Sequence, residues 1–192
     1  GIGAVAIAAL IGVSLGLIAA FASRTLDDIL VATLDILIAF PTLLLAMLIV
    51  AASDGASLGT AILAIGVAAS AIVARLTRIL ARRVLAMDYV TAARVAGTSW
   101  IGIVRIHVLP NIWPTLIVNL ALQFGLAVIA EASLSYLGLG APPPNASWGR
   151  LLQEAQGTVY TAPFGAVAPG LALLSLVIGL NLTADGLRDI SD

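Results

Sequence analysis

The chain has 192 residues, of which 61% are hydrophobic and 10% are charged, and its mean hydropathy is +1.13. Soluble domains are about 45–50% apolar and about 25% charged, so this composition excludes an ordinary soluble enzyme, a disordered protein and a nucleic-acid-binding protein. The sequence contains no cysteine, no lysine and a single histidine, His107. It therefore offers no disulfide framework, no cysteine or multi-histidine metal site, and no ATPase phosphate-binding loop, because that loop requires a lysine.

Long apolar runs occur along the whole chain. A helix needs roughly 20 residues to cross the hydrocarbon core of a membrane, and each run supplies that length. The runs predict an all-α transmembrane helical bundle that forms a single domain over residues 1–192. Pro41 and Pro169 lie inside two of the runs and predict kinks there. The predicted spans are about 2–22, 29–52, 58–80, 111–135 and 163–184.

The distribution of arginine predicts the orientation of the bundle. Eight of the nine arginines lie in alternate connections between the spans, and only Arg150 lies in the others. Cytoplasmic loops carry the excess of basic residues in membrane proteins. We therefore expect residues 88–110 and the C-terminus in the cytoplasm, and the loop 136–162 on the outer side. Gly1 would then lie outside, which predicts an earlier helix upstream of this chain.

The outer loop begins with the rigid segment Leu137–Pro144. The segment Ser147–Gln156 follows and predicts a short helix with Ser147 as its N-cap.

The inner connection predicts two short helices, Tyr89–Ala96 and Ser99–His107. Gly97 would end the first, and Thr98 or Ser99 would cap the second. Pro110 is expected to end the second helix, and Pro114 falls in the first turn of the next span. The first short helix has no catalytic groups, and its small side chains at Ala92 and Ala93 suit close docking against another protein.

Several blocks of this sequence resemble a known family. Ala92-Ala93, Gly97 and Leu109-Pro110 have the spacing of the EAA loop, the signature of permease subunits of bacterial ABC importers. The resemblance is closest to the C-type permease of the dipeptide, oligopeptide and nickel systems, and it covers essentially the whole chain. The blocks that carry this closer resemblance are IAFPTLLLA at 38–46, HVLPN at 107–111, AEASLSYLGLG at 130–140, SWG at 147–149 and NLTADGLRD at 181–189.

This resemblance implies a type I importer permease fold in the bacterial inner membrane, with helices two to six of a six-helix subunit in this chain. It implies a second permease subunit, as a heterodimer, two ATPases that bind ATP and Mg²⁺, and an extracytoplasmic solute-binding protein. The chain itself would be no enzyme and would hold no cofactor or metal. The expected ATPase-coupling residues are Tyr89, Val90, Thr91, Ala92, Ala93, Arg94, Gly97, Leu109 and Pro110. Thr91 departs from the family, which usually has a glutamate there, and Ala32 stands where relatives often have a basic residue.

Three further sets of residues leave alternatives open. Asp35 and Glu131 lie in or at the edge of spans, where they could contact solute or form structural pairs, and pairing is favoured. Arg75, Arg78 and Arg82 form one helical stripe, for which reaching to lipid headgroups is favoured over contact with an ATPase. Small residues recur at every fourth position from 8 to 20 and predict helix packing, either within the chain or against the partner permease.

A self-contained ion-coupled secondary transporter or channel is the alternative function. It would need membrane-embedded acids that form a coupling site, and only Asp35 and Glu131 are available, near opposite faces of the membrane.

Overall fold

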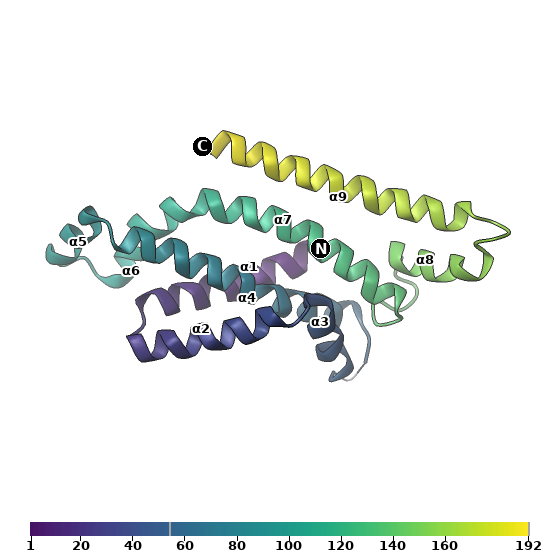
Figure 1. The fold of residues 1–192 in the computed structure, drawn as a ribbon, viewed down its shortest axis with the longest axis horizontal. Coiled ribbons are helices and arrows are strands. Elements are labelled where there is room, and N and C mark those ends of the chain that lie inside the picture. Colours follow the sequence, from purple (N-terminus) through teal and green to yellow (C-terminus); the bar gives the residue numbers. More distant parts are fainter. Residues whose placement is uncertain (54, 192) are drawn as a thin grey trace.

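The computed structural model describes residues 1–53 and 55–191, and at 187, 188, 190 and 191 it describes the backbone alone. The side chain of Arg188, one of the arginines that predict the orientation, lies outside the described part. Every regular element in these ranges is a helix (Figure 1). In chain order they are α1 (Ile2–Phe21), α2 (Arg24–Ala39), α3 (Thr42–Ala51), α4 (Leu58–Leu85), α5 (Asp88–Val95), α6 (Trp100–Ile103), the π-helix η1 (Val104–Val108), α7 (Leu109–Tyr136), α8 (Trp148–Ala155), the 3₁₀ turn η2 (Gln156–Thr158) and α9 (Phe164–Ser191).

The long helices run along the long axis of the molecule. The short helices α5 and α6 project at one end, α8 lies at the other, and α9 follows the outer side of α7 (Figure 1). Among the described residues, four helical units are long and apolar enough to cross a membrane, namely α1, α4, the continuous run Trp100–Tyr136 and α9. The pair α2–α3 makes a fifth if the bent pair is one span. The predicted all-helical membrane bundle is confirmed.

The predicted second span is broken in the middle. Helices α2 and α3 meet at an angle of 93°. Pro41 cannot donate a backbone hydrogen bond, and its ring disfavours helical geometry in the preceding residue. Phe40 is accordingly extended, with φ −77° and ψ 132°. The predicted interruption at Pro41 is present, and it is sharper than a kink because Pro41 separates two helices.

Helices α1 and α4 form the tightest contact in the bundle. The small residues predicted to pack lie on this face, and Ala8, Gly12 and Gly16 are buried. A Cβ atom at Gly12 would lie 2.6 Å from the Cβ of Val73, and one at Gly16 would lie 2.6 Å from the Cβ of Thr77. Side chains larger than hydrogen are thus excluded at both glycines. The predicted helix packing of these residues is present, and α4 is the helix that they contact.

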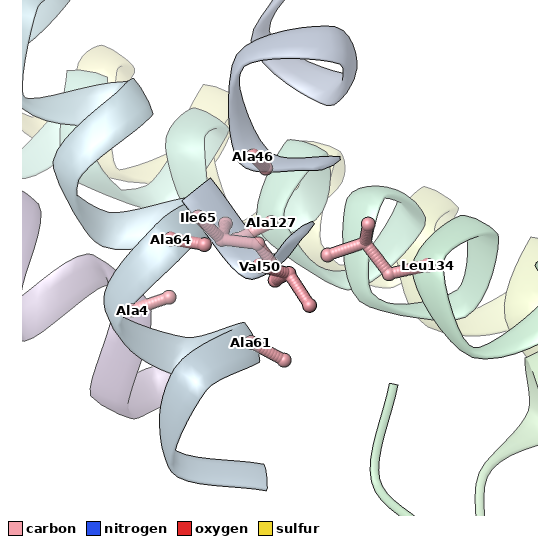
Figure 2. Close-up of a cluster of buried hydrophobic side chains, with 8 residues drawn as sticks. All are labelled: Ala4, Ala46, Val50, Ala61, Ala64, Ile65, Ala127 and Leu134. Carbon is pink, nitrogen blue, oxygen red and sulfur yellow. The ribbon is translucent and has the colours of Figure 1, made fainter. Parts of the chain in front are cut away.

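The core follows from this close approach. Figure 2 shows buried side chains from α1, α3, α4 and α7 meeting in one cluster. The buried members of the cluster are Ala4, Ala46, Val50, Ala61, Ala64, Ile65, Ala127 and Leu134.

Helix α4 starts with a capping box. Ser57 Oγ accepts from the Thr60 backbone N–H at 3.0 Å, and Thr60 Oγ1 accepts from the Ser57 N–H at 2.9 Å.

The end of the predicted second short helix differs from expectation. Helicity continues from Trp100 to Tyr136, so Pro110 does not end it. Instead the turn before Pro110 is a π-helix, in which the Leu109 N–H bonds to the Val104 carbonyl. This wider turn accommodates a proline, which lacks an N–H and whose ring would clash with the carbonyl four residues earlier. The short helix and the long helix α7 are therefore one continuous unit.

Candidate functional site

The first short helix of the inner connection is present as α5, one residue earlier than predicted. Gly97 has a φ of +88°, a backbone conformation that glycine adopts without steric cost. The Thr98 N–H bonds to the Ala93 carbonyl and the Gly97 N–H to the Arg94 carbonyl, each at 3.0 Å. These two bonds form a Schellman motif and confirm that Gly97 ends the helix. Of the two predicted caps for the next helix, Ser99 is the one used, because its Oγ accepts from the Gly102 N–H.

Helix α5 is anchored to the bundle chiefly by one side chain. Val90 is fully buried, in a cluster with Val84, Ile103 and Val108. Most of the rest of the helix faces outward, and Val95 is 84% exposed. The other exposed positions of the segment 91–97 are Thr91, Ala92, Arg94, Ala96 and Gly97, while Ala93 is half-buried. The result is a protruding surface of small side chains on a fixed base.

The remaining predicted coupling residues lie at the base of α5. The ring of Tyr89 packs against the ring of His107, with centroids 5.6 Å apart and planes tilted by 56°. Leu109 packs against the same cluster as Val90, and Pro110 is exposed beside it. Residues 89–97 and 109–110, far apart in the sequence, thus belong to one end of the molecule (Figure 1). His107 has a packing role in this contact.

A charged cluster joins α2 to α4. Asp27 is only 3% exposed, and its carboxylate accepts from Arg78 Nε at 2.5 Å and from Arg78 Nη2 at 2.7 Å. Arg82 Nη2 lies 2.7 Å from the same carboxylate. Two arginines of the predicted stripe are therefore held by an acid of the same chain. Neither contact weighed for the stripe, with lipid headgroups or with an ATPase, included this pairing, which arises because a buried carboxylate requires paired charges.

Asp35 forms the third contact between the same two helices. Arg75 Nη1 lies 2.8 Å from Asp35 Oδ1, and both side chains are about half exposed, at 52% and 47%. Sequence reasoning missed Asp27. Asp27 pairs with Arg78 and Asp35 pairs with Arg75, so the acids and the arginines follow each other in opposite sequence order. Residues on two antiparallel helices pair in this order, and that order is the signal that would have indicated Asp27.

Glu131 is paired at the opposite end of the bundle. One of its carboxylate oxygens accepts from Ser135 Oγ at 2.7 Å and from Ser147 Oγ at 3.1 Å. Ser147 precedes α8 as predicted, but its hydroxyl does not cap that helix because it donates to Glu131. A Cβ atom at Gly149 would overlap the backbone of Ala132, so α8 lies directly against α7. The favoured interpretation, structural pairing, fits both Asp35 and Glu131.

The two acids do not come together. Asp35 is on α2 and Glu131 on α7, and they share no hydrogen-bond partner. Within residues 1–53 and 55–191, no group of three His, Asp or Glu side chains is placed to hold a metal ion. The charged groups of the site thus fix helices to one another.

These features define a polytopic membrane protein with a short, protruding helix at one end. Residues 12–192 match the family described as the binding-protein-dependent transport system inner membrane component, and the chain belongs to this family.

Curated relatives agree with this assignment. The chain is 40% identical over 97% of its length to a putative peptide transport system permease protein of Brucella suis. It is 38% identical over its whole length to the di/tripeptide transport system permease protein DppC of Pseudomonas aeruginosa. It is 36% identical, again over its whole length, to the glutathione transport system permease protein GsiD of Pectobacterium atrosepticum. The chain spans 62%, 63% and 64% of these relatives, respectively.

A solved structure shares the fold. A chain of the MetNI methionine ABC transporter, in an inward-facing conformation, superposes with a TM-score of 0.80 at 19% sequence identity. The match covers 98% of this chain and 89% of the transporter chain. The predicted importer permease fold is thereby confirmed.

Proposed function

We propose that this chain is the membrane-spanning permease of an ATP-driven importer for peptides or a related small solute. Membership of the binding-protein-dependent transport family is the observation that carries this proposal. The partners would be a second permease, two ATPases and an extracytoplasmic solute-binding protein. Residues 88–110 would then lie in the cytoplasm, the loop 136–162 outside, and the C-terminus inside.

In this proposal α5 is the helix that contacts an ATPase. Its surface supports the role, because Val90 fixes the helix to the core while Thr91, Ala92 and Val95 are exposed for contact. The unit from Trp100 to Tyr136 is helical throughout, so a force applied at α5 and α6 would reach the membrane span directly. Closure of the ATPases would in this way change the conformation of the spans by a rigid-body movement.

The alternative of a self-contained ion-coupled transporter is less well supported. It requires acids that exchange ions inside the membrane, whereas Asp35 and Glu131 each have a partner in the chain and lie on separate helices.

Co-purification of the ATPase tests the proposal. Ala92→Trp adds a large ring to an exposed position of α5, so we expect retained ATPase to fall at least tenfold while the permease stays in the membrane. Ala146→Trp places the same ring on an exposed residue at the opposite end and should leave retention unchanged. If wild-type permease retains no ATPase, or if Ala92→Trp retains it normally, the proposed role of α5 is wrong.

Labelling from one side of the membrane tests the orientation. Val95→Cys and Asn145→Cys each place the single thiol of the chain at an exposed position. In intact spheroplasts, an impermeant maleimide should label only the Asn145→Cys protein. The reverse pattern would overturn the proposed sidedness.

A further inference from the structure

Helix α7 carries a regular line of uncharged polar residues. Between positions 111 and 130, the only polar side chains are Asn111, Thr115, Asn119 and Gln123. They recur at every fourth position, so they lie along one face of the helix, with a drift of about 40° per step. Polar side chains inside a membrane are costly unless they face a partner or water.

The two inner members of this line have no hydrogen-bond partner among the described side chains and backbone groups. Gln123 is only 6% exposed, yet its amide makes no hydrogen bond to any described residue. Asn119 Oδ1 is buried and also lacks a hydrogen-bond partner within the described ranges. Polar residues that join membrane helices do so by bonding across the interface. Within the described ranges neither amide has that role, and the buried, unpaired oxygen of Asn119 carries a free-energy cost of desolvation.

Gln123 lines a cavity of about 180 Å³ between α3, α4 and α7. Ile65 and Ala127, which also line it, belong to the cluster in Figure 2, so the cavity borders the core of the bundle. Leu43 and Thr42 close it from α3, the half of the broken span that the bend at Pro41 brings inward. A cavity of about 150 Å³ holds a benzene-sized group, so this one has room for one apolar side chain.

The chemistry of the cavity fits one class of ligand. A glutamine amide both donates and accepts hydrogen bonds, as does a peptide unit. None of the residues that line the cavity is charged. Such a site has no ligand for a metal ion and no counter-charge for a strongly charged solute.

We propose that Gln123 and Asn119 contact the peptide backbone of the transported solute, while the cavity between α3, α4 and α7 receives an apolar side chain. This assignment rests on the proposed transport function and extends it to the substrate class. The polar line on α7 continues through Thr115 and Asn111 toward the end that carries α5, and it provides a polar track along the span.

Thiol labelling of the assembled importer tests the location of the site. The chain has no cysteine, so Asn119→Cys, Gln123→Cys and Leu122→Cys each give a single thiol. Leu122 is the matched control, because it neighbours Gln123 but lies off the polar line and does not line the cavity. We expect a water-soluble methanethiosulfonate reagent to modify positions 119 and 123 at least tenfold faster than position 122. Equal rates, or faster modification at 122, would overturn the proposal.

Uptake by the same complex tests the ligand. With a pool of radiolabelled di- and tripeptides, Gln123→Leu should lower the uptake rate about tenfold, as expected for loss of a buried hydrogen bond, and Gln123→Asn should recover part of it. Uptake at the wild-type rate by Gln123→Leu, or no uptake of this pool by wild type, would overturn the peptide assignment. ATPase retention in the same preparations separates the two hypotheses, since wild-type retention supports the permease function whatever the result at position 123.

Discussion

Helices α4 and α9 have the same mean hydropathy, 1.9 over their most apolar windows, but very different surroundings. In α4, 56% of that window is buried within the chain, whereas in α9 the share is 6%. The difference comes from side-chain size and charge. The buried face of α4 is rich in alanine and receives Gly12 and Gly16 of α1, while the outward face of α9 carries large side chains such as Leu171, Leu174 and Ile178.

Hydropathy therefore indicates that a helix enters the membrane, and small residues indicate which of its faces meets another helix. No ion pair among the described side chains involves α9, whereas α4 has three ion-pair contacts with α2. This comparison leads to predictions about how the two helices respond to the same change.

The largest effect is expected at the buried acid beside α4. Asp27→Ala leaves Arg78 without its carboxylate partner in a partly buried site, and the free energy of unfolding should fall by about 3 kcal/mol. Thermal unfolding in detergent, followed by tryptophan fluorescence, measures the change. Asp185→Ala removes an exposed acid from α9 and should leave the transition where it is. An equal shift in both variants would contradict the contrast between the helices.

A glycine substitution gives the most direct comparison. Gly16→Leu forces a side chain into the contact between α1 and α4, and overpacking of this kind costs about 2–3 kcal/mol. Gly179 on α9 has no atom within 4 Å of a built Cβ, so Gly179→Leu should fold and accumulate normally. The amount of folded protein in the membrane and its thermal midpoint provide the measurement. Loss of both variants would show that α9 is packed more tightly than the chain alone indicates.

A smaller effect is expected where α8 meets α7. Ser147→Ala removes the hydroxyl that donates to Glu131, and its loss should weaken this contact by about 1 kcal/mol. Hydrogen exchange of the α8 amides should become faster, with little change in α4. In Ser175→Ala, the lost hydroxyl bonds only to Leu171 in its own helix, so exchange in α8 should stay at the wild-type rate.

The smallest effect is expected for the exposed pair. Arg75→Gln breaks a contact whose two side chains are about half exposed, so the loss should be about 0.5 kcal/mol and should shrink with added salt. A shift as large as that of Asp27→Ala would mean that the pair is more deeply buried in the assembled protein.

The sequence was most informative where local signals act. Apolar runs located the long helices, and Gly97 marked the end of α5, because both depend on neighbouring residues. The sequence was least informative where a side chain's contact depends on a residue far away in the chain. Ser147 has the sequence of an N-cap, but Glu131, 16 residues away, takes its hydroxyl. Arg78 and Arg82 resemble headgroup-binding residues until Asp27 is brought next to them by folding.

The candidate site also contains features that depend on local sequence and features that depend on the fold. The sequence of the inner connection predicted a short helix that contains Ala92 and Ala93, and α5 is present; its docking role stays a prediction. The cavity at Gln123 needed the fold, because it exists only where the bend at Pro41 places α3 beside α7. The four-residue spacing of polar side chains on α7 is nevertheless visible in the sequence.

The π turn at 104–108 has a geometric consequence for the connection to α5. A π turn holds one residue more than an α-helical turn, and the wider turn takes up that residue while the helix on either side keeps its course. The inner connection thus gains a residue between α5 and the span without a change in the face that α7 presents to the bundle. Deletion of one residue from this turn would return it to α-helical geometry and bring the ring of Pro110 against the carbonyl four residues before it.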